Sequence, residues 1–165
     1  MTNKITYNTV KVKLINYQSW REKMTVKISL WEAYLIETLR SNGMPTLELI
    51  DHLKQENKQA LTAFDDTFDY SELVDIYKED PNRIEQAINL GYQVKFVTQP
   101  GVKRLLQLKF GFEEGKDFNL ENNIFVNLRL TEEQLTIFKQ ILSPNWEIIA
   151  TGDGTYHIRL VAMTN

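Results

Sequence analysis

The chain has 165 residues, of which 42% are hydrophobic and 25% charged, and its formal net charge is −3 at pH 7. This composition suits a single domain over 1–165 and excludes a disordered polymer. The absence of Cys excludes disulfides and thiolate metal sites. There is no apolar signal core and no apolar run near the roughly 18 residues of a membrane span. We therefore expect a cytoplasmic protein without membrane contact.

The charges are segregated along the chain. Residues 1–28 carry six bases and one acid, whereas residues 51–86 carry ten acids and four bases. Residues 87–112 carry four bases and no acid. Such separation can create opposite patches that steer different partners, or the two signs can face each other and neutralise within the fold.

The N-terminal part predicts a strand and then a helix. Apolar and basic residues alternate within 5–14, as in a strand with one wet face. Ser29 and Glu32 match the capping-box pattern that begins a helix, and Asn42-Gly43 matches a helix end.

More helices are predicted up to residue 90. Thr46 is expected to cap a helix running towards Phe64, with a break near Asn57 left open. An acidic connection over 65–69 precedes a short helix over 71–77. Asp80-Pro81 then begins a further helix, because Asp suits the N-cap and Pro the first helical position.

The pattern changes after Gly91 to alternating strands and helices. The last two strands flank Thr151-Gly152-Asp153-Gly154, which predicts a β-hairpin. Thr131 and Gln134 form a second capping-box pattern. The expected elements are a strand over 92–96, a helix over 100–109, a strand over 124–130, a helix over 131–143, and hairpin strands over 146–150 and 156–162.

Together these elements predict an α/β (or α+β) fold. Helical crossovers favour parallel strands, so we expect a small mixed sheet with the last hairpin strand antiparallel at its edge. The strand over 5–14 could join this sheet. The helical segment over 29–90 either covers one face or forms a helical subdomain beside an α/β subdomain over 92–162.

The first candidate binding site lies between the strand at 92 and the following helix. Backbone N–H groups at a helix start favour anions, Gly permits close approach, and the nearby bases add positive charge. The alternative is an ordinary turn with solvated bases, since the segment is neither a P-loop nor a G-x-G-x-x-G loop. The candidate partner-binding residues are Lys95, Thr98, Gln99, Gly101, Lys103, Arg104 and Lys109.

The second candidate is an atypical helix-turn-helix over 71–90 that would read nucleic acid. Its second helix would present Asn82, Arg83, Gln86 and Asn89 to a DNA groove. The tight turn at Asp80, the single base and the lack of a second wing strand instead favour plain helical packing.

The third candidate is an acidic patch formed by Asp65, Asp66 and Asp69. It could dock a basic partner or resemble nucleic-acid phosphates, or it could be a solvated face. It does not fit a calcium loop, because the sixth and twelfth positions counted from Asp65 are Tyr70 and Ile76.

No catalytic or cofactor signature is present. The two histidines, His52 and His157, lack partners at metal-ligand spacing, and no activated-serine motif occurs. Residues 91–98 resemble the second-strand entry of Rossmann-like domains without the companion glycine fingerprint, so no function is carried over from them. We expect no enzyme activity, no cofactor and no metal.

These observations favour a non-catalytic regulatory or inhibitory protein that binds another protein through a charged face. The rival hypothesis is a nucleic-acid-binding regulator that uses the basic stretch 95–109. A third class, an enzyme using only Asp, Glu, Tyr and Lys, would require a pocket holding a carboxylate with a shifted pKa.

Overall fold

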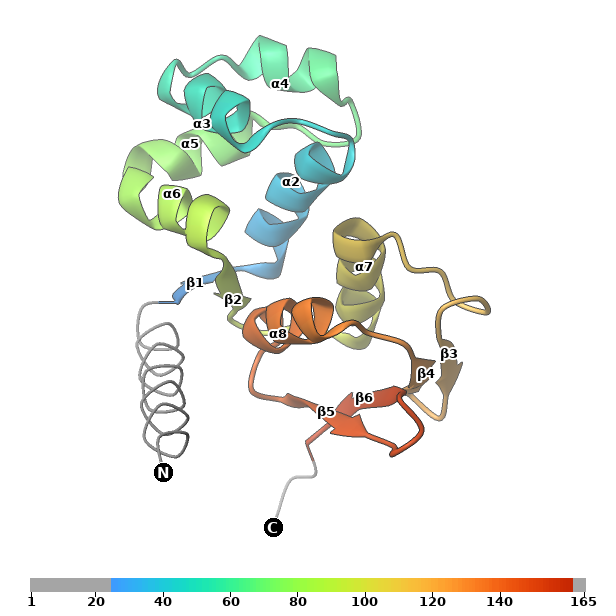
Figure 1. The fold of residues 1–165 in the computed structure, drawn as a ribbon. Coiled ribbons are helices and arrows are strands. Elements are labelled where there is room, and N and C mark those ends of the chain that lie inside the picture. The colour runs from blue at the N-terminus through green and yellow to red at the C-terminus, as the bar shows by residue number, and fades with distance from the viewer. Residues whose placement is uncertain (1–24, 162–165) are drawn as a thin grey trace, which may run out of the picture.

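The computed structural model describes residues 25–161. The predicted strand over 5–14 therefore lies outside the described residues. A group of helices lies above a lower part in which two helices accompany a small sheet (Figure 1). The upper part holds β1 (Val26–Ile28), α2 (Leu30–Ser41), α3 (Thr46–Lys54), α4 (Lys58–Phe64), α5 (Ser71–Glu79) and α6 (Pro81–Leu90).

The helix starts follow from local capping. Ser29 Oγ accepts from the Glu32 N–H at 3.1 Å, and Glu32 Oε2 accepts from the Ser29 N–H, which confirms the first capping box. Asp80 caps α6 by accepting from the Arg83 N–H, and Pro81 is the first helical residue, as predicted.

The predicted helix beginning at Thr46 is two helices. Asn57 caps α4 by accepting from the Ala60 N–H at 3.1 Å, so the break lies at this residue. The expected cap at Thr46 is wrong, because Pro45 occupies the N-cap position and Thr46 is the first residue of α3. Proline suits this place because an N-cap N–H needs no helical partner.

A two-stranded parallel sheet joins the upper and lower parts. In it β1 pairs with β2 (Tyr92–Val94), and each strand is followed by a helix: α2 comes directly after β1, and α7 (Gln99–Phe110) comes after residues 95–98. Ile28, Tyr92 and Val94 are buried. The two helices pack side by side, and their buried side chains belong to one continuous core cluster.

A four-stranded antiparallel sheet forms the base of the lower part (Figure 1). Its order is β3-β4-β6-β5, with the strands β3 (Asn119–Glu121), β4 (Ile124–Leu128), β5 (Trp146–Ala150) and β6 (Tyr156–Leu160). The helix α8 (Glu132–Ile141) connects β4 to β5 and begins with the predicted Thr131–Gln134 capping box.

The mixed α/β class and the C-terminal hairpin are confirmed. Two details differ. The strands described divide into two sheets, because β2 pairs with β1 and not with the hairpin. The last strand, β6, lies inside its sheet because β4 pairs with its second side, and β5 takes the edge.

Candidate functional site

The backbone between β2 and α7 is held by the backbone of β1 and by side chains at the start of β5. The Lys95 N–H donates to the Ile28 carbonyl at 2.8 Å, and the Val97 N–H donates to Ser143 Oγ at 2.9 Å. The Val97 carbonyl accepts from Asn145 Nδ2 at 3.2 Å and Trp146 Nε1 at 2.8 Å. These bonds satisfy the backbone on both sides of residue 96 and fix its direction.

Phe96 projects from this fixed segment with 63% of its surface exposed. Leu160 and Val161 are exposed at the end of β6, and the Val161 N–H donates to the Asn145 carbonyl. Since Asn145 also binds the Val97 carbonyl, these apolar residues lie at the same end of the molecule. We call Lys95, Phe96, Leu160 and Val161 the Phe96 surface.

Lys95 gives the Phe96 surface a positive charge. The side chain is exposed, and within residues 25–161 it has no ion-pair partner. Lys27 is exposed on the neighbouring strand β1, where it pairs with Gln93 of β2. Because Gln93 lies two residues before Lys95, Lys27 and Lys95 lie on the same face of the parallel pair. Lys95 directly precedes Phe96 in the chain, and an exposed cation without an ion-pair partner among residues 25–161 suits an acidic partner.

The other cations of the stretch 95–109 are directed to different neighbours. Lys103 Nζ forms an ion pair with Glu114, and Lys109 Nζ lies 2.8 Å from Glu37 Oε1. Arg104 Nη1 donates to Gln107 on its own helix at 2.9 Å. The stretch therefore does not present its four charges as one free row.

The residues at the start of α7 serve the helix itself. Thr98 Oγ1 caps α7 by accepting from the Gly101 N–H, and Gln99 is the first, half-buried residue of the helix. A Cβ added at Gly101 would lie 2.8 Å from Leu30 Cδ2. The glycine thus permits α7 to approach α2, and the partner-binding role expected for these three residues stays a prediction.

The acidic residues over 65–69 build their own turn. Asp65 accepts from Asn42 Nδ2, from Thr67 and from the Tyr70 hydroxyl. Asp69 accepts from Ser71, and these hydrogen bonds lower the pKa of the Asp69 carboxyl. Asp66 is exposed, so the three carboxylates differ in how freely they could meet a partner.

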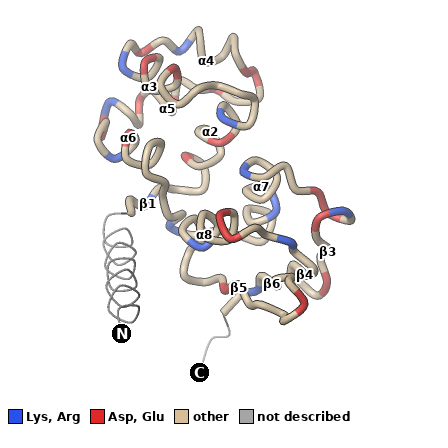
Figure 2. The backbone as a smooth tube through the Cα atoms, viewed as in Figure 1, with Lys and Arg blue, Asp and Glu red and all other residues tan. Residues whose placement is uncertain are grey.

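Four of the ten acids of the acidic tract form ion pairs within the helical part, where positive and negative positions are interspersed (Figure 2). Lys58 pairs with Asp75, and Lys78 pairs with Glu56. The neutralising bases come from the tract itself and not from the basic stretch. The ion pairs thus neutralise part of the tract, and six of its acids form no ion pair among the described residues, so the two alternatives raised by the sequence both stay open.

The helices of the predicted helix-turn-helix are α5 and α6, and Asp80 alone connects them. Arg83, the base of the proposed reading helix, lies 2.8 Å from the buried carboxylate of Glu32 on α2. The following strand pairs in parallel with β1, so it does not form a wing hairpin. These contacts favour helical packing for the segment.

Two features of this region were not predicted from the sequence. Phe96 was expected as an ordinary strand residue, and nothing local indicates that the strand ends before it. Glu37 is 2% exposed and accepts from the Tyr92 hydroxyl at 3.0 Å as well as from Lys109. Ala33, four residues earlier on the same face of α2, is buried as well, and this spacing is the signal that could have identified Glu37 as a buried carboxylate.

No protein-family model, curated protein or solved structure matches this chain in the comparisons made. Within residues 25–161, no group of three or more His, Asp or Glu residues is arranged to hold a metal ion. None of the described helices combines the length and apolarity needed to cross a membrane.

Proposed function

We propose that this protein is a non-catalytic regulatory or inhibitory binding protein, and that it uses the Phe96 surface to bind an acidic, partly apolar surface of another protein. The observation that carries the proposal is the exposure of Phe96, 63%, next to Val97, whose N–H and carbonyl are both held by buried hydrogen bonds, while the Lys95 N–H on the other side donates to the Ile28 carbonyl. Phe96, Leu160 and Val161 are exposed apolar residues at one end of the molecule, and exposed apolar residues that gather in one place, unlike single ones, are typical of interaction sites.

The geometry suits an interface hot spot. Aromatic residues dominate binding energy when they enter a pocket on the partner, and a rigid anchor loses little conformational entropy on binding. Lys95 adds a charge that selects an acidic rim and speeds encounter. The mechanism is occlusion or scaffolding, and the proposal keeps the cytoplasmic setting expected from the composition.

The nucleic-acid alternative has less support. Phosphate binding needs several free cations along one track, whereas Lys103 and Lys109 are already paired with carboxylates. Exposed apolar side chains beside Lys95 suit a protein surface better than a phosphate backbone.

The test is site-specific photocrosslinking in a native lysate, followed by affinity measurement with the captured protein. A photoreactive phenylalanine analogue replaces Phe96, and the matched control places it at Leu47, which is 76% exposed on α3. Phe96→Asp and Lys95→Glu should each weaken the affinity by about tenfold or more, as for hot-spot residues, while Leu47→Asp leaves it unchanged.

Equal affinity of wild type and Phe96→Asp would refute the proposal. Capture of nucleic acid in place of protein, with affinity falling steeply between about 50 and 200 mM salt, would support the rival hypothesis.

A further inference from the structure

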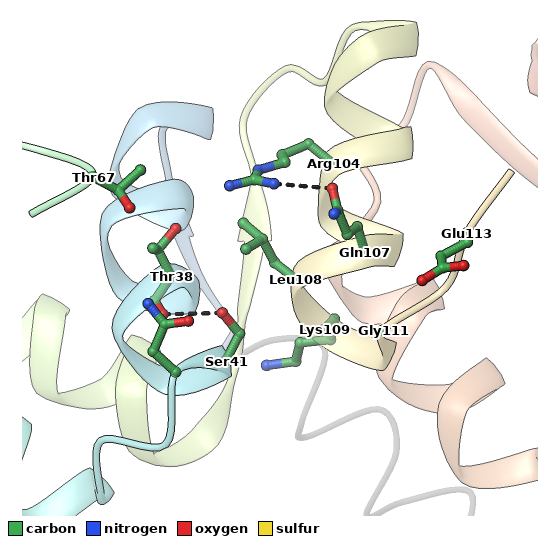
Figure 3. Close-up of a pocket in the computed structure, with 10 residues that line it drawn as sticks. Thr38, Ser41, Thr67, Arg104, Gln107, Leu108, Lys109, Gly111 and Glu113 are labelled. Atoms are coloured by element: carbon green, nitrogen blue, oxygen red, sulfur yellow. Dashed lines mark hydrogen bonds between the residues drawn. The ribbon is translucent and has the colours of Figure 1, made fainter. Parts of the chain in front are cut away.

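A polar cleft opens between α2 and α7, at the junction of the helical part and the α/β part (Figure 3). Its volume is about 540 Å³, within the range of small-molecule sites. Thr38 and Ser41 line it from α2, and Arg104, Leu108 and Lys109 line it from α7. The cleft is separate from the Phe96 surface.

Arg104 supplies an uncompensated positive charge to this cleft. Its side chain extends from α7 towards α2 (Figure 3). Burial raises the pKa of Tyr34 on α2, and the positive charge of Arg104 acts in the opposite direction, so the guanidinium acts electrostatically on α2. The guanidinium donates to Gln107, and no carboxylate of the described residues forms an ion pair with it. A guanidinium has five N–H donors, so several remain for a ligand.

The other charged residues that line the cleft have ion-pair partners. Lys109 pairs with Glu37 at 2.8 Å, and Glu113 lies 3.9 Å from Lys116. The neighbouring Asp65 carboxylate accepts from Asn42 on the cleft wall. Among the charged residues that line the cleft, Arg104 alone has no ion-pair partner within residues 25–161, so the lining favours a negatively charged ligand; the Asp65 carboxylate lies behind Asn42 and does not line the cleft.

Thr38 provides an independent observation. Its side chain is 3% exposed, and its hydroxyl oxygen is buried without a hydrogen-bond partner. A helical threonine ordinarily bonds the carbonyl four residues earlier, as Thr136 Oγ1 does with the Glu132 carbonyl at 2.8 Å in α8. A buried hydroxyl without a partner is costly, and a ligand in the cleft would supply one.

We propose that the α2–α7 cleft binds a small oxyanion, a carboxylate or a phosphate ester, with its charged group on Arg104 and a second oxygen bonded to Thr38 Oγ1. The planar guanidinium favours bidentate contact with either group. Because the ligand contacts both helices, its binding links the helical part to the α/β part.

The test is NMR titration of the full chain with inorganic phosphate and, separately, with citrate, at ionic strength matched with sodium chloride. We expect saturable shifts of the Thr38, Ser41 and Gly111 amides with at least one probe. The probe that binds identifies the ligand as phosphate or carboxylate.

Variants assign the contacts. Arg104→Gln should weaken binding by about tenfold or more, as for loss of a charge-assisted hydrogen bond. Thr38→Val should weaken it several-fold without lowering the thermal midpoint of the free protein, because the change removes a hydroxyl that is costly when it has no partner. Lys139→Gln, an exposed charge on α8, is the matched control and should bind as wild type does. Shifts that fail to saturate with both probes, or unchanged affinity in Arg104→Gln, would overturn the proposal.

Discussion

Glu37 on α2 and Lys109 on α7 form an ion pair, with 2.8 Å between Oε1 and Nζ, whose side chains are only 3% and 17% exposed. The Tyr92 hydroxyl donates to the same carboxylate oxygen at 3.0 Å. Burial and the negative charge of Glu37 raise the pKa of Tyr92 well above its ordinary value. One carboxylate thus connects α2, β2 and α7, the elements that join the two parts of the protein.

Glu37→Gln should lower the free energy of unfolding by about 3 kcal/mol, because it leaves the Lys109 ammonium without its partner in a poorly hydrated place. The amide oxygen of the new glutamine can still accept from the Tyr92 hydroxyl, so the loss of unfolding free energy measures the effect of removing the negative charge of Glu37. Urea denaturation measures it. Glu121→Gln, on the exposed strand β3, is the control and should change stability by less than about 0.5 kcal/mol.

The double variant Glu37→Gln/Lys109→Met should recover much of this loss, since it removes the unpaired charge and keeps the aliphatic stem. A single Glu37→Gln variant as stable as wild type would show that the pair contributes nothing to stability.

Gly101 permits the close approach of α7 to α2, because an added Cβ would lie 2.8 Å from Leu30 Cδ2. Gly101→Ala brings the helix-propensity gain of alanine and the cost of this overlap. In a Leu30→Ala background the overlap disappears, so the same substitution should be more favourable by about 1 kcal/mol or more. A double-mutant cycle of urea unfolding measures the coupling, and additive effects would contradict the packing role assigned to Gly101.

The local parts of this fold could be predicted from the sequence, because caps depend on residues three or four apart. Ser29, Asp80 and Thr131 begin helices as their patterns indicate, and Gly111 ends α7 in the left-handed conformation. The division into two sheets could not be predicted, since β1 and β2 meet across the whole helical segment. The strand β3 escaped notice because two of its three residues, Asn119 and Glu121, are polar and exposed.

The candidate site shows the same limit. The sequence predicted a binding site in the segment after residue 92. Which of its charges stay free, however, depends on ion-pair partners that are distant in the chain. Glu37, which pairs with Lys109, is 72 residues away in the chain. Phe96 is exposed because Ser143, Asn145 and Trp146 take the backbone groups of Val97 and end the strand before it. No local pattern reports these contacts.

Tyr77 should make the protein sensitive to alkali. Burial, together with the hydrogen bond to Glu85 at 2.7 Å, raises its pKa to about 12. The unfolded chain ionises near pH 10, so stability is fully present below that pH and falls as pH rises towards the folded pKa.

Between pH 10 and 11, wild type should lose about 1 kcal/mol more stability than Tyr77→Phe, which has no phenol to ionise. The comparison removes contributions from lysines, because both proteins share them. Urea denaturation at pH 8, 10 and 11 measures the difference. Parallel pH dependences of the two proteins would mean that Tyr77 titrates alike in the folded and unfolded states.

Ser143 should control how firmly Phe96 is presented. Its hydroxyl is buried, accepts from the Val97 N–H and donates to Asn145 Oδ1. Ser143→Ala leaves the Val97 N–H unsatisfied, at a cost of about 1 to 3 kcal/mol. We expect faster hydrogen exchange at the Val97 amide and weaker binding to the captured partner, although no residue of the Phe96 surface has changed. Thr136→Ala, which removes an exposed hydroxyl on α8, is the control and should alter neither measurement. If Ser143→Ala speeds exchange at Val97 and leaves the affinity intact, rigid presentation of Phe96 is not what the interface requires.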